Sequence, residues 1–505
     1  MSPISLVQSI DYTAIAPPLA VAIAALGVLV ADLFVPAPWR RNVAAGISLV
    51  GVSVSLGFTA WLATSTGRRT FCLGGGDCSY VVDDFTLFFQ VLFLGSSLIV
   101  LLLSLTLFTD GRVPAGEYHL LLLSSVVGML VLAAARDLLT LLVALEVVSL
   151  PAFVLVGLRR GDPRAGEAAL KFFLFSVVST ALTVYGIALV YGVTGTIAFG
   201  GIAAKLTTLH GHSGAMAATA AAGVVLVLVG FGFKVSAVPF HFWAPDTYQG
   251  APVPIAAFLS VASKAAGFAG LIVLLTHAFR AYADVWGAVI AVLAAVTMTV
   301  GNVIALRQWH LVRLLAWSTV AQAGYLLVPL GVAATAHGRA DAEMADAVRA
   351  TLGYLGIYAA MNLGAFACSV LILRRHPRGA ITDLRGLVRS APAVALALAF
   401  FLTALAGLPP GVAGLFAKVV VLRAAVHGHV AWLAVVAAVN TVIGLAYYLR
   451  VAALLFSGVD EPEAPKVRLR PDGAGAAAVL LTAALTVALS VDPQPLLHAA
   501  GLASR

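Results

Sequence analysis

Lysines inside apolar stretches are the residues of this sequence whose type and placement could do chemistry. Only six of the 30 basic residues are lysines, and four of them lie in strongly apolar surroundings: Lys171, Lys234, Lys264 and Lys418. Arginine is effectively always protonated, whereas a desolvated lysine can lose its proton near neutral pH. Glu146, also among aliphatic residues, adds a group of opposite charge. We therefore predict a relay of proton-exchanging groups in an apolar medium.

That medium is predicted to be a lipid bilayer. The chain of 505 residues is 61% hydrophobic and 10% charged, with a mean hydropathy of +1.02. Apolar runs of about 20 residues are long enough to cross a hydrocarbon core of ~30 Å as helices. Fourteen spans are predicted, at about 14–35, 43–64, 84–109, 118–135, 138–158, 166–192, 216–240, 252–277, 285–306, 311–332, 350–373, 392–424, 430–456 and 474–491. The first span lacks a basic leader and a small-residue cleavage site, so we expect it to be retained.

The loops between these spans carry an uneven distribution of basic residues. Alternate loops from 36–42 onward hold sixteen lysines and arginines, and the other side holds nine. The positive-inside rule then predicts that both termini lie outside. The basic cytoplasmic loops account for the net charge of +8, so no nucleic-acid partner is expected.

The three cysteines limit the redox chemistry that this chain could perform. Cys72 and Cys78 bracket FCLGGGDCSY in a loop assigned to the outer face, where they form either a local disulfide or two free thiols. Cys368 lies in an apolar helix. No Cys/His spacing is typical of a zinc site, an iron–sulfur cluster or a haem attachment, and the GGGDC cluster, which follows no predicted strand, is interpreted as a turn rather than a phosphate loop. Any redox centre is therefore expected in a partner chain.

The fifth span contains an acidic residue. Glu146 lies about two turns in from Asp137 and is the only acidic residue in the middle of any predicted span. Such a carboxyl group must find a partner or be neutral, so it either makes a helix–helix hydrogen bond or belongs to a proton path. We favour the path, and we expect Glu146 and Lys234 to come within reach of each other or of a shared water across spans five and seven.

The seventh span is predicted to be broken. Lys234 precedes Pro239 by five residues, and proline removes a backbone donor and frees a carbonyl group. The proline-rich run 239–254 is expected to form the cytoplasmic turn into span eight, near the membrane interface, where His241 and Asp246 are either proton-exchanging groups or parts of a solvated turn. Lys264 is expected about halfway along span eight, too deep to reach the headgroups.

The twelfth span repeats this pattern. Gly407, Pro409 and Pro410 interrupt an apolar helix, and Lys418 follows the interruption. Two breaks that each lie near a buried lysine predict an internally duplicated transporter core. The helix that corresponds to the Glu146 helix offers only neutral polar groups, and we expect three of them to be the partners of Lys418: Ser318, Thr319 and Gln322.

Four segments carry a resemblance to a known family: LLVALEVVSLPAFVLVGLRR, KFFLFSVVSTALTVYGIALVYGVTGT, KVSAVPFHFWAPDTYQGAPVPIAAFLSVASKAAG and LAGLPPGVAGLFAKVVV. They resemble the antiporter-like membrane subunits of respiratory complex I, and the resemblance covers essentially the whole chain beyond the first two spans. It implies an all-α polytopic membrane protein of about fourteen transmembrane helices, with two inverted five-helix repeats and with helices seven and twelve broken. The implied divisions are helices 1–3 (1–110), the first repeat (111–280), the second repeat (281–457) and helix 14 (458–505).

The resemblance also implies roles for residues and partners. Glu146 corresponds to the helix-five glutamate, Lys234 to the helix-seven lysine, Lys264 to the connecting lysine of helix eight and Lys418 to the terminal lysine of helix twelve. As auxiliary residues we add His241, Lys171, Ser318, Thr319 and Gln322, with helix breaks at Pro239, Pro409 and Pro410. This chain is expected to bind no cofactor and no metal. We expect a complex in the bacterial cell membrane, in which the partners of this chain are other membrane subunits and a hydrophilic electron-transfer arm. Those partners are expected to bind NADH, FMN, iron–sulfur clusters and quinone. If the chain comes from a GC-rich bacterium, the quinone is expected to be menaquinone.

Two other functions compete with that of a complex I subunit, namely a cation/proton antiporter subunit and a structural membrane anchor. A subunit of an Mrp-type cation/proton antiporter shares the Lys234 motif, but that family and the M-type complex I subunit resemble each other in a glutamate where this chain has Lys418. The L-type subunit continues into a lateral helix for which a chain ending at Arg505 has no room. A structural membrane anchor is the second alternative, but an anchor has no use for four buried lysines.

Overall fold

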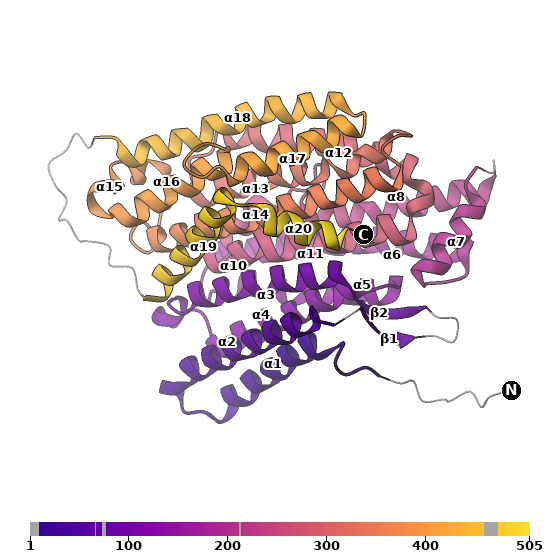
Figure 1. Ribbon diagram of the computed structural model, residues 1–505. Coiled ribbons are helices and arrows are strands. Elements are labelled where there is room, and N and C mark those ends of the chain that lie inside the picture. Colours follow the sequence, from indigo (N-terminus) through magenta and orange to yellow (C-terminus); the bar gives the residue numbers. More distant parts are fainter. Residues whose placement is uncertain (1–9, 66, 73–76, 212–213, 459–472, 505) are drawn as a thin grey trace.

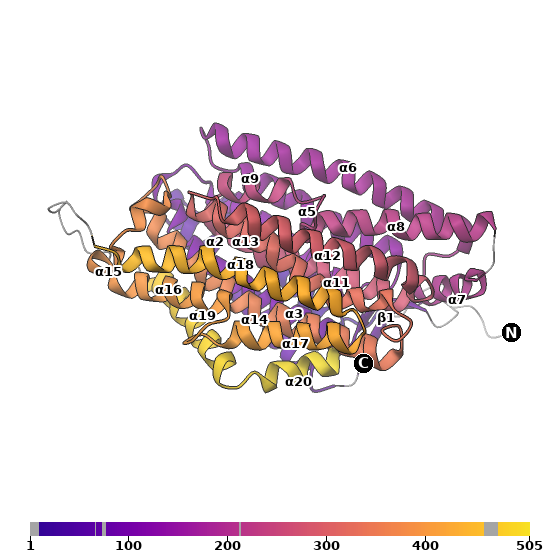
Figure 2. The same ribbon diagram turned by 90° about the horizontal axis from the view of Figure 1, so that it is seen from above.

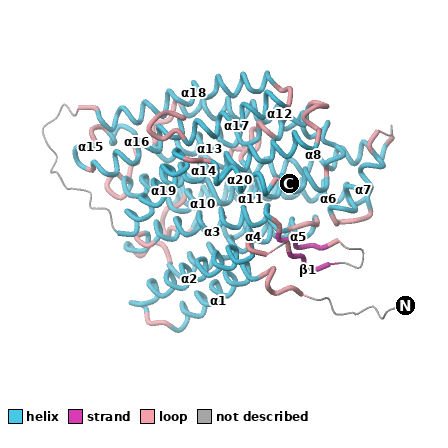
Figure 3. The backbone as a smooth tube through the Cα atoms, viewed as in Figure 1, coloured by secondary structure: helices cyan, strands magenta, loops and turns pink. Residues whose placement is uncertain are grey.

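The computed structural model describes residues 10–65, 67–72, 77–211, 214–458 and 473–504. In this part of the chain the fold is a bundle of helices that run side by side (Figure 1). The N-terminal helices α1 and α2 lie on one side of the bundle, and α18 lies on the other. Seen from above, α6 follows one edge and α20 the opposite edge (Figure 2). The tube in Figure 3 shows strands only in one hairpin at an end of the bundle.

Most predicted spans are single helices. The first six are α1 (Ala16–Phe34), α2 (Ala37–Leu62), α3 (Asp84–Ser104), α4 (Ala115–Ala134), α5 (Leu138–Gly157) and α6 (Pro163–Thr194). The later unbroken spans are α12 (Ala283–Ala305), α13 (Leu311–Leu327), α14 (Asp341–Leu373), α18 (Ala431–Phe456) and α19 (Gly473–Val491). Within the described residues, 12 helices are long and apolar enough to cross a bilayer. The chain is therefore a multi-pass membrane protein.

The seventh span is broken, but not as predicted. Helix α8 (Ala215–Val235) ends before Pro239, and a second half-helix, α9 (Trp243–Gly250), packs against α6 and α13. The predicted cytoplasmic turn over 239–254 is therefore wrong, since the turn into the next span is confined to the junction between α9 and α10. A helix can restart at Trp243 because Pro245 falls in its first turn, where a missing N–H breaks no hydrogen bond.

The half-helix α9 is held by an aromatic contact. Trp243 stacks on Phe172 of α6 with ring centroids 4.5 Å apart. Its indole Nε1 donates a hydrogen bond to the carbonyl oxygen of Phe233, at 3.0 Å. The side chain thus bridges the break from α9 back to α8.

The eighth span is one continuous helical segment from Val253 to Ala278, and it is buried from Pro254 to Leu275. It consists of α10 (Val253–Phe258), the π-helical turn η2 (Leu259–Ser263), α11 (Lys264–Val273) and a second π turn η3 (Leu274–Ala278). The first π turn ends directly before Lys264. Single π turns inside helices are frequent at functional sites, and no feature of the sequence predicted this one.

The twelfth span is broken at the predicted prolines. Helix α16 (Pro392–Ala406) and helix α17 (Ala413–His427) have 15 residues each, and Pro409 and Pro410 lie between them. A single helix of 15 residues is too short to cross a ~30 Å core at about 1.5 Å per residue. Helix α13, with 17 residues, is also short. These two spans explain why fewer than fourteen helices have full crossing length.

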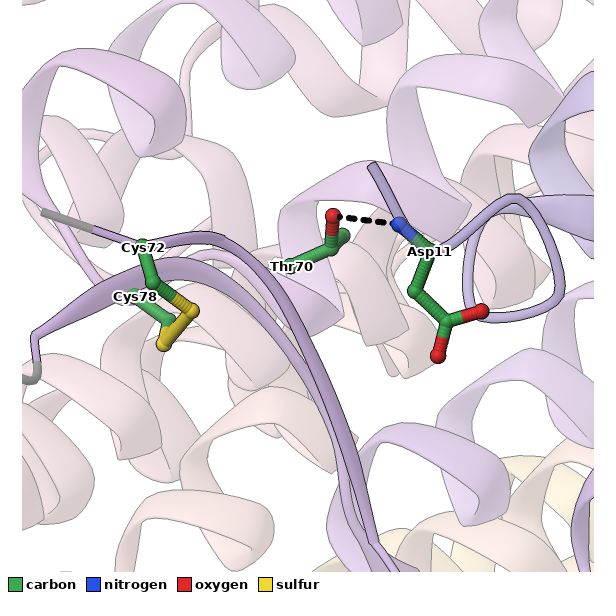
Figure 4. Close-up of a disulfide and its surroundings, with 4 residues drawn as sticks. All are labelled: Asp11, Thr70, Cys72 and Cys78. Carbon is green, nitrogen blue, oxygen red and sulfur yellow. Dashed lines mark hydrogen bonds between the residues drawn. A yellow bond between two sulfur atoms is a disulfide. The ribbon is translucent and has the colours of Figure 1, made fainter. Parts of the chain in front are cut away.

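Several elements were not predicted. The short helices α7 (Phe199–Leu209), α15 (Leu387–Ser390) and α20 (Gln494–Ala503) and the antiparallel strands β1 (Arg68–Cys72) and β2 (Cys78–Val82) lie outside the spans. Figure 4 shows the Cys72–Cys78 disulfide between the strands, which confirms one of the two open alternatives. In the same view the backbone N–H of Asp11 donates to the Thr70 hydroxyl, at 3.0 Å, and ties the N-terminal segment to β1. The glycine cluster does follow a strand, contrary to the prediction, while residues 73–76 themselves lie outside the described part.

Close packing at the twelfth-span break gives a first testable prediction, at Gly414 of α17. A Cβ atom at this position would overlap the carbonyl oxygen of Ala404 in α16, whereas a Cβ atom at Gly192 of α6 would meet nothing within 4 Å. We expect Gly414→Ala to destabilise the subunit by about 1–3 kcal/mol because the two half-helices must move apart. Gly192→Ala should be neutral or slightly stabilising. Thermal unfolding of the detergent-solubilised protein measures the difference, and equal unfolding temperatures would contradict the prediction.

Candidate functional site

Lys234 lies in the last turn of α8 and is 3% exposed. Its Nζ donates to the hydroxyl of Ser149 on α5, at 2.9 Å, and that hydroxyl in turn donates to the carbonyl oxygen of Leu145, at 2.7 Å. A Cβ atom at Gly267 of α11 would lie 2.9 Å from Cγ of Lys234. The absence of a side chain at Gly267 therefore lets the aliphatic part of the lysine pass between α8 and α11.

Glu146 lies on α5 close to Lys234. The Thr180 hydroxyl of α6 donates to its Oε1, at 2.8 Å. A cavity of about 10 Å³, which is room for about one water molecule, is lined by both residues and by the hydroxyls of Ser149, Ser176, Ser179, Thr180 and Thr183. Glu146 and Lys234 thus line one small cavity, in agreement with the expectation that they come within reach of a shared water, which stays a prediction. Each of the two makes its own hydrogen bond to a hydroxyl instead of to the other.

Lys264 is 1% exposed and lies in the middle of the eighth span, as predicted. Its Nζ donates to the backbone carbonyl oxygen of Thr319 on α13, at 2.7 Å. The hydroxyl of Tyr358 on α14 lies beside this contact and donates to the carbonyl oxygen of Ser260, at 3.0 Å, and to Oγ1 of Thr319, at 3.3 Å. Thr319 is thus a neighbour of Lys264 and not, as predicted, of Lys418.

Lys418 lies on α17 and is 6% exposed. Its Nζ donates to the carbonyl oxygens of Leu405, at 3.1 Å, and Ala406, at 2.8 Å, in the last turn of α16. In a continuous helix these two carbonyls would accept from the residues four places on, which here are Pro409 and Pro410 and have no N–H. The prediction that Lys418 lies beside carbonyls freed by the break is confirmed.

The predicted neutral partners of Lys418 are wrong. Ser318 and Gln322 of α13 are hydrogen-bonded to the hydroxyl of Tyr448 on α18, at 2.5 Å and 3.3 Å, and the hydroxyl of Tyr354 on α14 donates to Oε1 of Gln322. Nζ of Lys418 instead lies 5.9 Å from the ring centre of Tyr325. Tyr325 is one of the neutral polar groups of its helix that the sequence offers, whereas Tyr354 and Tyr448 gave no signal, because aromatic residues are ordinary constituents of apolar helices.

His241 lies inside the break of the seventh span and is buried. Its ring lies edge to face against Trp317 of α13, with centroids 5.3 Å apart. His241 is therefore packed among protein side chains and does not lie in a solvated turn, while its depth in the membrane stays a prediction. The eight residues of α9 separate it from the start of the next span.

Lys171 does not lie in an apolar interior, contrary to the prediction. Its side chain is 41% exposed, and Nζ contacts Glu167 Oε1 of the same helix at 2.7 Å and Asp246 Oδ2 of α9 at 2.9 Å. The sequence around Lys171 is apolar, so it did not predict that the lysine would pair with Asp246 and Glu167. The pairing of Lys171 is therefore a consequence of how α6 and α9 pack.

A charged vestibule surrounds Lys171. It measures about 930 Å³ and lies where α5, α9 and α14 end and where α6, α10 and α13 begin. Its charged lining residues are Arg159, Asp162, Arg164, Glu167, Lys171, Asp246, Arg313, Arg374 and Arg378. His310 also lines it, and burial together with the nearby Arg313 and Arg164 cations lowers the pKa of this histidine. The vestibule is therefore a polar, predominantly cationic opening at one end of the bundle.

Metal binding has no basis in the described part of the chain. No three histidine, cysteine, aspartate or glutamate residues gather there in a way that could hold an ion. The three buried lysines have only hydroxyl and carbonyl oxygens as hydrogen-bond acceptors.

The chain belongs to the NADH:quinone oxidoreductase/Mrp antiporter transmembrane family, whose sequence profile matches residues 135–444. The NADH-quinone oxidoreductase subunit N 2 of Streptomyces griseus is 50% identical to it, over 99% of this chain and 94% of the relative. Within the family, the chain therefore belongs with subunit N of NADH-quinone oxidoreductase. The resemblance to the antiporter-like subunits of complex I is confirmed.

Solved structures share this fold. A chain of respiratory complex I from Thermus thermophilus with bound aureothin superposes with a TM-score of 0.75 at 30% identity, covering 95% of this chain and 98% of that one. A chain of the Mrp complex from Dietzia sp. superposes with a TM-score of 0.78 at 20% identity, over 97% of each chain. The complex I chain and the Mrp chain therefore share the fold of this protein. They differ in sequence identity to it, which is 30% for the complex I chain and 20% for the Mrp chain.

Proposed function

We propose that this chain moves protons across the membrane as a non-redox subunit of a NADH:quinone oxidoreductase. Electron transfer from NADH to quinone in partner subunits would drive the movement. The observation that carries the proposal is that Lys234, Lys264 and Lys418 are buried and donate only to neutral oxygen atoms. A lysine with no carboxylate bonded to it is not fixed in one charge state, so a proton can arrive and leave.

The proposed path is a horizontal one through the middle of the bundle. It runs from the Glu146–Lys234 cavity to Lys264 and then to Lys418. The Cβ-free surface of Gly267 brings α11, which begins at Lys264, against the Lys234 side chain. Helix α13 supplies both the Thr319 carbonyl that binds Lys264 and the Tyr325 ring beside Lys418. His241, in the break next to α8, and Ser318 and Gln322, in the tyrosine cluster, are proposed to be auxiliary groups.

We propose that the vestibule end faces the cytoplasm and that both termini lie outside, in the plasma membrane of a bacterium. The excess of arginine at the vestibule agrees with the positive-inside rule. The hairpin lies at the opposite end, since Tyr80 of β2 pairs with Ala135 and Asp137 with Ala198 where α5 begins. Its disulfide fits an oxidising outer face.

The partners proposed for this chain are the other membrane subunits and the hydrophilic arm that carries NADH, FMN, iron–sulfur clusters and quinone. The two inverted repeats, 111–280 and 281–457, stay a proposal supported by the breaks between α8 and α9 and between α16 and α17. An Mrp-type antiporter function is the competing proposal. The 50% identity to a subunit N argues against it.

The function is tested with Lys234→Met in the assembled complex reconstituted into vesicles. Removing a group that transfers a proton slows the transfer by about 10²–10⁴-fold. We therefore expect the ratio of protons pumped to electrons transferred to fall by the number of protons that this chain contributes. Lys205→Met, on the exposed face of α7, is the matched control. An unchanged ratio in Lys234→Met would refute the proposal, and sodium-driven proton exchange without NADH would favour the antiporter.

A further inference from the structure

Asp246 joins three helices through one carboxylate. Its Oδ2 accepts from Nζ of Lys171 on α6, at 2.9 Å, and its Oδ1 accepts from Nη1 of Arg313 on α13, at 2.7 Å. The same Nη1 also donates to Oε1 of Gln249 on α9, at 2.9 Å. Both oxygens are thus occupied by cations that come from two different helices packed against the half-helix α9. We call Lys171, Asp246 and Arg313 the ion triad.

Each helix in the ion triad also carries a partner of the proposed relay. Helix α6 continues from Lys171 to Thr180, whose hydroxyl binds Glu146. Helix α13 continues from Arg313 to Thr319, whose carbonyl binds Lys264. On α9, Trp243 reaches back to the carbonyl oxygen of Phe233, the residue before Lys234. The ion triad therefore joins the helices that position the first three members of the relay.

The ion triad sets the positions of the three helices and contributes little to the free energy of folding. The side chains of Lys171, Asp246 and Arg313 are 41%, 31% and 34% exposed, because all three line the vestibule. Ion pairs in contact with water are weak, so they add little to the stability of a bundle with so large a buried core. They do fix the distances between three helices, one of which is a half-helix of eight residues with a break at its start.

We propose that Asp246 is a positioning residue that holds the half-helix α9 to α6 and α13 at once, and so keeps the Glu146–Lys234 pair and Lys264 in register. This inference rests on the proposed function. Without the carboxylate, the like charges of Lys171 and Arg313 lose the anion that they share, and the three helices lose their common anchor. A misplacement of reacting groups by about 1 Å can slow a transfer by about 10²-fold.

The vestibule contains a matched control for this inference. Glu167 also lines it and also binds Lys171, at 2.7 Å, but it lies on the same helix, α6, four residues earlier. Glu167→Gln removes one carboxylate from the same space and from the same lysine without releasing any helix from another. If Asp246→Asn lowers the proton-to-electron ratio and Glu167→Gln does not, the cause is the lost link between helices and not the lost charge in the vestibule.

The test measures the proton-to-electron ratio, the rate of NADH:quinone electron transfer and the amount of assembled complex, with the complex reconstituted in vesicles. In Asp246→Asn we expect proton transfer through this chain to slow by about 10- to 100-fold while the complex still assembles. Asp246→Glu, which keeps the carboxylate, should restore the ratio. Glu167→Gln should keep the full ratio. If Asp246→Asn does not assemble, Arg313→Gln removes one arm of the triad and should lower the ratio in its place.

The outcomes separate this inference from the proposed function. A full ratio in Asp246→Asn, or in Arg313→Gln, together with a lowered ratio in Lys234→Met overturns the positioning role alone. Full ratios in both Asp246→Asn and Lys234→Met overturn the proposed function. Equal losses in Asp246→Asn and Glu167→Gln would also overturn the positioning role, since they would show that only the charge of the vestibule matters.

Discussion

Proton pumping is expected to fail in Lys264→Arg while the complex assembles normally. Arginine keeps the positive charge and can still donate to the Thr319 carbonyl, which Lys264 contacts at 2.7 Å. It releases a proton far less readily, since the unperturbed pKa values of arginine and lysine differ by about 2–3 units, a factor of about 100 or more. The substitution therefore preserves the electrostatics of this position and blocks transfer through it.

The measurement for Lys264→Arg is the proton-to-electron ratio in vesicles, beside the amount of subunit in the purified complex. Lys205→Arg, on the exposed face of α7, is the matched control for the same exchange of side chains. A normal ratio in Lys264→Arg would show that this lysine contributes a fixed charge and no proton.

Lys418→Met is expected to lower proton transport more than electron transfer. The variant removes the titratable group at the end of the proposed path, and loss of such a group costs about 10²–10⁴-fold in transfer rate. It also leaves the carbonyls of Leu405 and Ala406 without their donor, because the prolines four places on have no N–H. Each unpaired buried carbonyl costs about 1–3 kcal/mol, so the unfolding temperature should fall as well.

Two comparisons separate these effects of Lys418→Met. Tyr325→Phe removes the tyrosine hydroxyl and keeps the ring, whose centre lies 5.9 Å from the lysine Nζ. It should change proton transport much less than Lys418→Met does. Full proton-to-electron stoichiometry in Lys418→Met, with the unfolding temperature lowered, would show that the lysine only caps the broken helix.

The residues of the proposed relay stand out by their type and their surroundings. Charge inside a bilayer is costly, so Glu146, Lys234, Lys264 and Lys418 stand out in apolar runs wherever the helices pack. The same argument failed for Lys171. It lies in an apolar run too, but one face of α6 meets the vestibule near the end of the bundle, where the lysine is paired with carboxylates.

At the helix breaks, the local sequence is sufficient to predict which backbone groups lose their hydrogen-bond partners. Pro409 and Pro410 leave two carbonyls of α16 without donors whatever the rest of the chain does, because proline has no N–H, and a buried carbonyl must find another donor. That Lys418 is this donor follows from α17 folding back against the end of α16. The prediction of Ser318, Thr319 and Gln322 as its partners used only correspondence between repeats and could not foresee the competing tyrosines of α14 and α18.

By itself the sequence determined the membrane-spanning character, the position of nearly every span, the two breaks and the three buried lysines Lys234, Lys264 and Lys418. All of these follow from the cost of placing polar groups in hydrocarbon and from the missing N–H of proline, which act locally along the chain. Only the tertiary structure decided the partner of each lysine, the burial of His241 and the ion triad of Asp246. Those depend on which faces of helices far apart in sequence come together, and a hydrogen bond forms only where donor and acceptor meet within about 3 Å.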